Sequence, residues 1–374
     1  MTIAPETLFN GLKQHGIGMF VGVPDSLLKS FCSFVEENAT REEHIIAANE
    51  GNAVAIAMGF HLSTRRVAVV YLQNSGLGNT INPLTSLADA QVYRVPMLLI
   101  VGWRGEPGVK DEPQHVKQGR ITEAQLKVLE IPYVVLDAES DVGAVLGEIF
   151  SALRETNAPV ALLVRQDTFA AYKTKRKPVP RSILSREGAL GEVLALAGPR
   201  DLIISTTGKT SRELFELRAK RGSPQRDFLT VGGMGHASSI ALGVALGKPE
   251  RRVICLDGDG ALLMHMGALA IIGDLKPANF FHILLNNAAH ESVGAQPTVA
   301  GSLNVEAIAN ATGYLAYALA TDVATLRVAW ERLRELRGPV MLEIALNTAA
   351  RENLGRPTST AEENKRAFME AADA

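Results

Sequence analysis

The chain has 374 residues, 47% of them hydrophobic and 21% charged, which supplies core for more than one domain and excludes intrinsic disorder. Its 38 Lys and Arg against 40 Asp and Glu give a formal net charge of -2, so the polybasic surface that nucleic-acid binding needs is missing. The two cysteines, Cys32 and Cys255, lie in apolar runs, which excludes a disulfide scaffold and favours a reducing compartment, so we expect a cytoplasmic protein.

Taken in chain order, the sequence starts without the basic and apolar regions of a signal peptide, and we expect none. No apolar run reaches about 18 residues, so we expect no membrane span. Short apolar runs alternate instead with helix-like segments such as 51–62 and 238–246. The runs lie at 67–72, 95–101, 159–164, 201–204, 253–256, 280–285 and 340–344. Their length and lack of polar alternation are typical of parallel strands covered on both faces, which predicts an α/β fold.

A basic, proline-punctuated stretch near the middle separates two halves of similar length. Residues 172–181 read Tyr-Lys-Thr-Lys-Arg-Lys-Pro-Val-Pro-Arg, which favours a solvated linker over a nucleic-acid patch. We therefore predict a first domain at 1–171, a linker at 172–187 and a second domain at 188–374. Each is expected to be a doubly wound parallel sheet, with ligands at the carboxyl ends of its strands.

The strongest chemical signal is the segment 257–261, Asp-Gly-Asp-Gly-Ala, directly after the run at 253–256. We expect a loop here, because a loop with so few side chains lets backbone N–H groups approach an anion, and a following helix would add its positive N-terminal end. Asp259 would then face the anion, which requires a bridging cation, and Asn286 and Asn287 follow the next apolar run. These oxygen donors suit Mg²⁺, so the pattern predicts a diphosphate–Mg²⁺ site. The alternative is a tight turn followed by an amide-rich turn.

A second signal lies in the first half, where Glu50 is the single charge between residues 45 and 59. A carboxylate among apolar residues is costly unless it hydrogen-bonds a specific partner. The functional interpretation is an acid of raised pKa that holds a proton on a buried ring nitrogen. The alternative is a glutamate that caps a helix N-terminus.

These two patterns together resemble the thiamine diphosphate-dependent enzymes over nearly the whole chain. Within that family, the segments most similar to phosphonopyruvate decarboxylases, with sulfopyruvate decarboxylases as nearest relatives, are 22–26, 73–79, 102–108, 110–120 and 290–298. The resemblance implies a pyrimidine-binding domain at 1–171, a diphosphate-binding domain at 188–374 and no middle domain. It also implies thiamine diphosphate and Mg²⁺ as cofactors.

The resemblance further implies roles for single residues. Glu50 would contact N1′ of the aminopyrimidine, and Met234 would hold the cofactor in a bent conformation. Metal ligands would be Asp259, Asn287 and the carbonyl of Ala289. Ala288 and Ala289 replace the more usual Asp-Gly, and the spacing to Asn287 is one residue longer than expected. Other implied cofactor contacts are Thr207, Gly208, Lys209, Thr210, Gly232, Gly258, Gly260 and Ala261.

For the substrate, the resemblance implies that Asp25 helps protonate the intermediate. The functional interpretation of His115 is a proton donor or a phosphonate ligand, and that of His290 is a residue that faces the thiazolium ring. Their alternatives are a helix cap for Asp25 and ordinary loop residues for the two histidines. An anionic 2-oxo acid needs cations, for which we select Arg104 and Lys110. Ser292 would also contact the substrate.

The implied reaction is non-oxidative decarboxylation of 3-phosphonopyruvate to phosphonoacetaldehyde and CO₂, as in phosphonate biosynthesis. One alternative is a different substrate, sulfopyruvate or another 2-oxo acid, and a second is carboligation. The residues do not distinguish these from the implied reaction. A nucleotide-binding regulatory protein is a third, which Glu50 argues against. In this family the pyrimidine and diphosphate domains pair across subunits, so the resemblance implies at least a homodimer with sites at the subunit interface.

Overall fold

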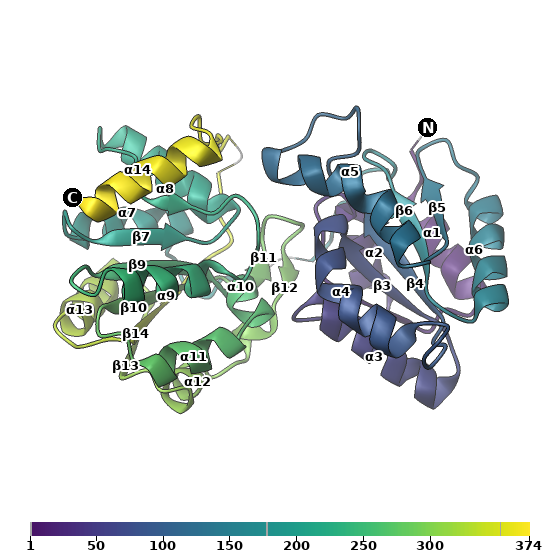
Figure 1. The fold of residues 1–374 in the computed structure, drawn as a ribbon, viewed down its shortest axis with the longest axis horizontal. Helices are drawn as coiled ribbons and strands as arrows, with labels where there is room; N and C mark the ends of the chain where they lie inside the picture. The colour runs from purple at the N-terminus through teal and green to yellow at the C-terminus, as the bar shows by residue number, and fades with distance from the viewer. Residues whose placement is uncertain (1, 177–178, 352) are drawn as a thin grey trace. The chain divides into compact units, whose positions relative to one another are not determined.

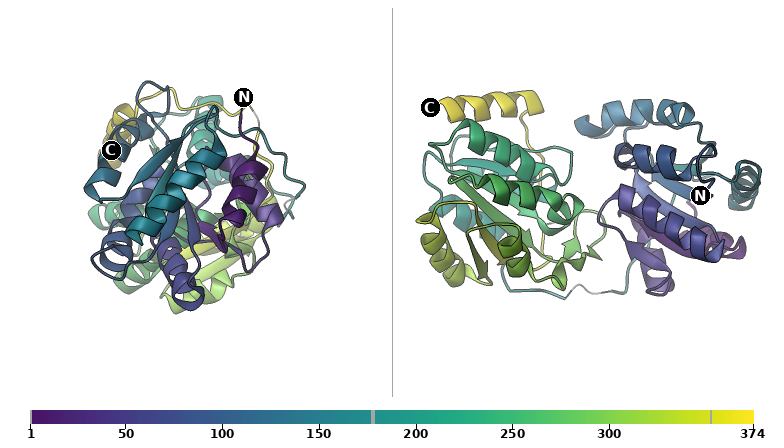
Figure 2. Two further views of the ribbon diagram at one scale, coloured as in Figure 1. Left: turned by 90° about the vertical axis from the view of Figure 1, so that its right-hand side faces the viewer. Right: turned by 60° about the horizontal axis from the view of Figure 1, so that its bottom comes forward.

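The computed structural model describes residues 2–176, 179–351 and 353–374. The chain divides into two compact units, Met1–Lys177 and Pro178–Ala374, and each is a sheet between two layers of helices (Figures 1 and 2). The division falls within the segment predicted as a linker, of which residues 177 and 178 lie outside the described part. In the part that is described, no helix combines the length and apolar character that crossing a membrane requires.

The ends of the basic linker pack on the units instead of standing free in solvent. On the side of the first unit, Arg176 forms an ion pair with Glu36. On the side of the second unit, Arg181 lies 3.0 Å from a carboxylate oxygen of Glu343. Part of the positive charge that the sequence concentrates here is therefore paired with local carboxylates.

The first unit is built on a six-stranded, entirely parallel sheet. In spatial order its strands are β2 (His44–Ile46), β1 (Met19–Gly22), β3 (Ala68–Gln73), β4 (Met97–Gly102), β6 (Val160–Val164) and β5 (Tyr133–Leu136). One face is covered by α1 (Pro5–Gln14), α2 (Lys29–Asn38) and α6 (Val142–Thr156), and the other by α3 (Glu50–Thr64), α4 (Leu77–Pro83), the short π-helical η2 (Leu84–Ala88) and α5 (Pro113–Val128). Val69 and Tyr71 of β3 pack into one core and Val70 and Leu72 into the other, which is why the predicted runs lack polar alternation.

The second unit has a six-stranded parallel sheet of its own. Its strands are, in spatial order, β13 (Ala316–Ala320), β14 (Val340–Ala345), β10 (Phe280–Asn286), β9 (Val253–Gly258), β7 (Leu202–Ser205) and β8 (Phe228–Leu229). Helices α7 (Arg186–Leu196), α8 (Lys209–Lys220) and α13 (Val323–Arg334) cover one face. The other is covered by α9 (Ala237–Gly247), α10 (Asp259–Met264), α11 (Gly267–Leu275), α12 (Val305–Ala311) and α14 (Ala361–Asp373).

A small antiparallel hairpin, β11 (Ala289–His290) and β12 (Gln296–Pro297), follows β10, and the 3₁₀ turn η3 (Val299–Gly301) comes next. Every predicted strand run overlaps an observed strand, and the two predicted helices lie within α3 and α9. One local expectation was wrong. No loop follows the strand at 253–256, because β9 continues to Gly258 and α10 begins at Asp259.

Both sheets have the same strand order when strands are numbered along the chain within each unit: second, first, third, fourth, sixth, fifth. The predicted pair of doubly wound domains is therefore confirmed as two copies of one topology. In this order the chain reverses direction across the sheet between the first and third strands. Ligands of open parallel sheets bind outside that reversal, which lies between β1 and β3 in the first unit and between β7 and β9 in the second.

Candidate active site

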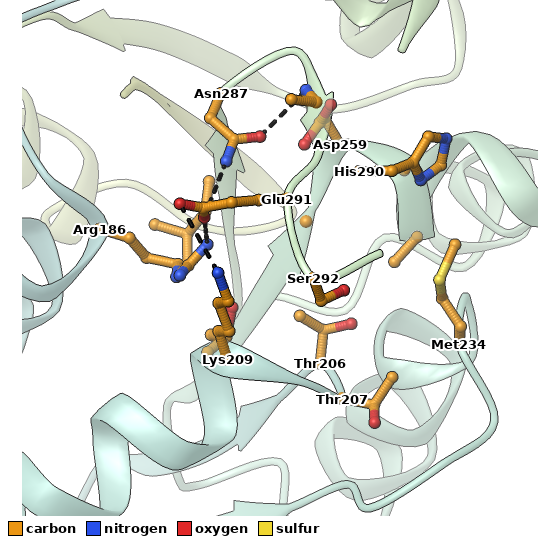
Figure 3. Close-up of a pocket in the computed structure, with 16 residues that line it drawn as sticks. Arg186, Thr206, Thr207, Lys209, Met234, Asp259, Asn287, His290, Glu291 and Ser292 are labelled. Atoms are coloured by element: carbon orange, nitrogen blue, oxygen red, sulfur yellow. Dashed lines mark hydrogen bonds and ion pairs between the residues drawn. The ribbon is translucent and has the colours of Figure 1, made fainter. Parts of the chain in front are cut away.

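In the second unit, a pocket opens at the reversal point between β7 and β9 (Figure 3). Thr206 and Thr207 follow β7, and Gly258 and Asp259 lie where β9 meets α10. The predicted residues that line this pocket are Thr207, Lys209, Thr210, Met234, Gly258, Asp259, Gly260, Ala261, Asn287, Ala289, His290 and Ser292. Predicted residues from four separate stretches of sequence thus meet at one place.

Two predicted contacts lie beside the pocket and not in its described lining. Gly208 is the N-cap residue of α8 with a φ of 89°, a conformation that glycine adopts at little cost. Gly232 precedes Met234 in the segment before α9.

Asp259 is a buried carboxyl at the start of α10, 4% exposed. Thr298, brought over it by the β11–β12 hairpin, donates a hydrogen bond to its Oδ2 atom. Burial raises the pKa of Asp259 from 3.8 to about 6, and the Thr298 hydrogen bond opposes part of that shift. A carboxylate placed at this cost is typical of a site that holds a cation.

The two asparagines of the pair have different roles. Asn286 is fully buried and donates a 2.9 Å hydrogen bond to Glu343 of β14, so it ties two strands together. Asn287 lines the pocket and accepts a 3.1 Å hydrogen bond from the N–H of Ala289. The Ala289 carbonyl accepts from the N–H of Glu291 at 2.9 Å.

Four charged side chains are among the described residues that line the pocket, and their charges cancel. Lys209 and Arg186 are the cations, and Asp259 and Glu291 are the anions. Burial lowers the pKa of Lys209. Burial alone would also lower the pKa of Arg186, but the hydrogen bonds and charges of Glu213 and Glu291 raise it. A diphosphate would meet no net positive charge here, so a divalent cation bound with it would supply the missing attraction. The carboxylate, amide and carbonyl oxygens present suit Mg²⁺.

His290 and Met234 lie on the same side of the pocket in Figure 3. Burial lowers the pKa of His290 to about 4, so the imidazole is neutral near pH 7. A β-carbon at Gly260 would lie 2.9 Å from the His290 ring, so the glycine leaves the ring its place. Ser292 is exposed at the rim.

In the first unit, Glu50 is the first residue of α3 and is 6% exposed. The helix cap is its neighbour Asn49, whose side chain accepts from the N–H of Asn52 at 2.9 Å. Asn79 donates a 2.7 Å hydrogen bond to Glu50 Oε2. Burial raises the pKa of Glu50, and the Asn79 hydrogen bond opposes part of the shift. Glu50 is thus not the helix cap, and its carboxyl carries a desolvation penalty that no cation offsets among its described contacts.

Asp25 spans the reversal point of the first sheet. Its Oδ1 accepts a 2.6 Å hydrogen bond from Gln73 at the end of β3, and its Oδ2 accepts from the N–H of Leu27 at 2.9 Å. Burial raises its pKa, and Gln73 and the charge of Arg104 oppose the rise. Asp25 is therefore both a cap for the turn before α2 and a buried acid joined to β3.

Arg104 lies at the edge of a neighbouring cavity of about 380 Å³, whose lining also includes Ser26 and Lys29. The Nε and Nη2 atoms of Arg104 donate to Asp111 at 2.8 and 2.5 Å, and Nη1 donates to Ser26 at 2.6 Å. The guanidinium is thus held rigidly, with its charge already paired. Lys110 is exposed in the adjoining loop, and His115 is half-buried in the first turn of α5.

Comparison with known proteins follows the same division. Residues 3–127 match the model of the thiamine pyrophosphate enzyme N-terminal TPP binding domain, and residues 207–344 match the C-terminal TPP binding domain. A phosphonopyruvate decarboxylase of Streptomyces viridochromogenes is 34% identical over 98% of this chain and 94% of its own length. The chain belongs to the thiamine pyrophosphate enzymes, in the phosphonopyruvate decarboxylase branch.

Two further relatives cover nearly the full chain. A phosphonopyruvate decarboxylase of Streptomyces hygroscopicus is 34% identical over 99% of this chain and 94% of its own length. A sulfopyruvate decarboxylase of Methanosarcina acetivorans is 27% identical over 98% of this chain and 97% of its own length. These comparisons confirm the resemblance that the motifs indicated. The two phosphonopyruvate decarboxylases are more similar to this chain than the sulfopyruvate decarboxylase is.

Several residues at the site escaped the sequence analysis. Arg186 lies in the predicted linker, far from every motif, and no sequence signal indicated it. Four more residues lie inside the segments that carried the resemblance: Gln73, Asn79, Glu291 and Thr298. Their hydrogen-bond partners lie 29 to 48 residues away along the chain or, for Glu291, on other elements. The only sequence signal that could have indicated these four residues is that each is polar and lies in such a segment.

Proposed function

We propose that the chain catalyses the thiamine diphosphate- and Mg²⁺-dependent decarboxylation of 3-phosphonopyruvate to phosphonoacetaldehyde and CO₂. The observation that carries this proposal is the presence of one buried carboxyl at a helix start in each unit: Glu50 begins α3, which follows β2, and Asp259 begins α10, which follows β9. One lacks a cation among its described contacts and suits proton transfer, and the other lies among oxygen donors. A protein that only bound a nucleotide would have no need of Glu50.

The second unit would hold the diphosphate end of the cofactor. Asp259, Asn287 and the Ala289 carbonyl would ligate Mg²⁺, and Lys209 with the N–H groups of the neighbouring turns would contact the phosphates. Because the charges of the lining cancel, cofactor binding should require the metal. Calorimetry with thiamine diphosphate in EDTA and then in Mg²⁺ measures this directly.

The first unit would hold the pyrimidine end. Thiamine diphosphate, when bound, supplies an electron-accepting ring for the carbon that loses CO₂. Glu50 would hold and exchange a proton at the pyrimidine ring nitrogen, for which its buried carboxyl with a raised pKa is suited. We expect Glu50→Gln to keep cofactor affinity and to lower kcat by about 10²-fold or more. Full activity in this variant would remove Glu50 from the mechanism.

The substrate's anionic tail would bind near Arg104, which Asp111 and Ser26 hold in place, with Lys110 as an exposed second cation. Ser292 would contact the substrate from the rim of the other pocket. Asp25, His115 and the neutral His290 would handle protons on the substrate. The buried Asp25, joined to Gln73, is the best placed of these to hold a proton.

The choice of substrate is tested by CO₂ release from 3-phosphonopyruvate, 3-sulfopyruvate, pyruvate and benzoylformate, each with and without the cofactor and Mg²⁺. We expect 3-phosphonopyruvate to have the highest kcat/KM. Sulfopyruvate is the second candidate, because the Methanosarcina relative matches the whole chain at lower identity. A higher kcat/KM for sulfopyruvate would replace the proposal with that one.

We also propose that the active enzyme is at least a homodimer, with the pyrimidine half of one chain completing the diphosphate half of its partner. Glu50→Gln and Asp259→Ala should each be inactive alone. When they are mixed and reassociated, mixed dimers would each regain one intact site, giving about one quarter of wild-type activity. No recovery after reassociation would contradict sites shared between subunits.

We further propose a cytoplasmic location. Its support is the pair of buried free cysteines, Cys32 and Cys255, which suit a reducing compartment. Fractionation of the producing cells would test it, and recovery of the protein outside the cytoplasm would reject it.

A further inference from the structure

Glu291 is a second carboxylate in the diphosphate pocket, and the proposed reaction gives it no role. Its side chain is 8% exposed. Its Oε2 atom accepts from Arg186 Nη1 at 2.6 Å and from Asn287 Nδ2 at 3.3 Å. Its Oε1 atom accepts from the N–H of Ala350 at 3.0 Å and lies 3.9 Å from Lys209 Nζ. Each of these four contacts is therefore with a hydrogen-bond donor or a cation.

Two contacts set which way the Asn287 amide points: the N–H of Ala289 donates to its Oδ1 at 3.1 Å, and its Nδ2 donates to Glu291 at 3.3 Å. An asparagine amide has two orientations of nearly equal size, with oxygen and nitrogen exchanged. An ionised carboxylate only accepts hydrogen bonds, so Glu291 requires the NH₂ group of Asn287 on its own side. In Figure 3 the amide nitrogen points to Glu291, and the oxygen lies on the side of Asp259. The oxygen is the atom that would bind a cation.

Arg186 fixes Glu291 in turn. Its Nε and Nη2 atoms donate to the two carboxylate oxygens of Glu213 at 2.8 and 2.9 Å. This forked pair leaves Nη1 for Glu291, and the guanidinium is 10% exposed. A buried bidentate pair has little freedom to rotate, so Glu291 receives its donor from a fixed direction.

We propose that Glu291 is a positioning residue for the metal site. It orients the amide oxygen of Asn287 toward the cation and steadies the ammonium of Lys209 beside the phosphates. This inference rests on the proposed function, because it assigns the cation site to Mg²⁺ bound with thiamine diphosphate. Partners of this kind behind a metal ligand change metal affinity by about 10- to 100-fold when they are removed.

The test is a double-mutant cycle on Mg²⁺ affinity, measured by calorimetry in saturating thiamine diphosphate. Glu291→Met keeps the length of the side chain and removes both accepting oxygens, so we expect Mg²⁺ to bind about 10- to 100-fold more weakly. Asn287→Asp should also bind weakly, because its new carboxylate would face Glu291. In the double variant both side-chain oxygens of residue 287 can accept and the repulsion is gone, so we expect tighter Mg²⁺ binding than in either single variant.

Glu216→Gln is the matched control. Glu216 accepts from the N–H of Gly355 at 2.6 Å, so it holds the same C-terminal segment that Glu291 contacts at Ala350, but it does not belong to the pocket lining described above. We expect wild-type Mg²⁺ affinity in this variant. An equal loss there would assign the effect to the segment and overturn the role of Glu291.

The outcomes separate this inference from the proposed function. If the wild-type protein takes up no Mg²⁺ and thiamine diphosphate, the proposed function itself fails. If the wild type binds both and the effects of Glu291→Met and Asn287→Asp simply multiply, or Glu291→Met binds Mg²⁺ normally, only the positioning role fails. Thermal unfolding of each variant shows whether a loss of binding reflects a loss of folding.

Discussion

Gly76→Ala should inactivate the enzyme without unfolding it, because the carboxyl of Glu50 packs directly against the Cα of Gly76. A β-carbon at residue 76 would lie 2.4 Å from Glu50 Oε1 and 2.6 Å from its Cδ. The backbone of Gly76 has a φ of -76°, which alanine adopts freely, so the substitution introduces a steric conflict and no backbone strain. The side chain of Glu50 must therefore move.

The size of that movement follows from ordinary contact distances. Non-bonded carbon atoms pack at about 3.5 to 4.0 Å, so the carboxyl carbon of Glu50, 2.6 Å from the new β-carbon, must shift by roughly 1 Å. This also disturbs the 2.7 Å hydrogen bond from Asn79. A misplacement of about 1 Å at a reacting group costs about 10²-fold in rate. We therefore expect kcat to fall about 10²-fold, while the free energy of unfolding changes by no more than about 1 kcal/mol.

The assay is CO₂ release from 3-phosphonopyruvate at saturating cofactor, together with calorimetric cofactor binding and thermal unfolding. Gly78→Ala is the matched control two residues away, since a β-carbon there would meet no atom within 4 Å. It should keep kcat within about twofold of wild type. Wild-type kcat in Gly76→Ala, or an equal loss in Gly78→Ala, would refute the reasoning.

Three other substitutions have defined outcomes. A β-carbon at Gly102 would lie 2.4 Å from Asp25 Oδ2, so Gly102→Ala should lower kcat by about 10-fold or more while calorimetric cofactor affinity stays unchanged. Asp259→Asn should abolish Mg²⁺ binding and yet stabilise the apoprotein. Folding raises the pKa of Asp259 from 3.8 to about 6, so ionisation of this carboxyl opposes folding by about 3 kcal/mol above pH 6. That gain should shrink as the pH falls toward 3.8, and a pH-independent gain in urea unfolding would reject the assignment. Ala288 has a φ of 54°, so Ala288→Gly should raise the free energy of unfolding by about 1 kcal/mol, and an unchanged thermal midpoint would count against strain there.

The sequence alone determined the features that depend on neighbours along the chain. Apolar runs without polar alternation predict buried parallel strands, and each of the seven predicted runs overlaps an observed strand. Two local patterns indicated buried polar groups: the lone Glu50 in an apolar stretch and the Asp-Gly-Asp-Gly segment after a strand. Burying a charge is costly, so a charged residue within an otherwise apolar stretch can be recognised from the sequence. These signals were local, and they identified the carboxyls and the asparagine pair.

Tertiary structure decided which residues serve each carboxyl, because those partners come from distant strands and helices. Nothing within the linker indicated that Arg186 would clamp Glu213 and Glu291. The sequence also could not show that Arg104 is already paired with Asp111, or that Gly76 supports Glu50. Such contacts depend on where the sheet reverses its strand order, and that reversal is a property of strand pairing in space, for which a single sequence carries no local signal.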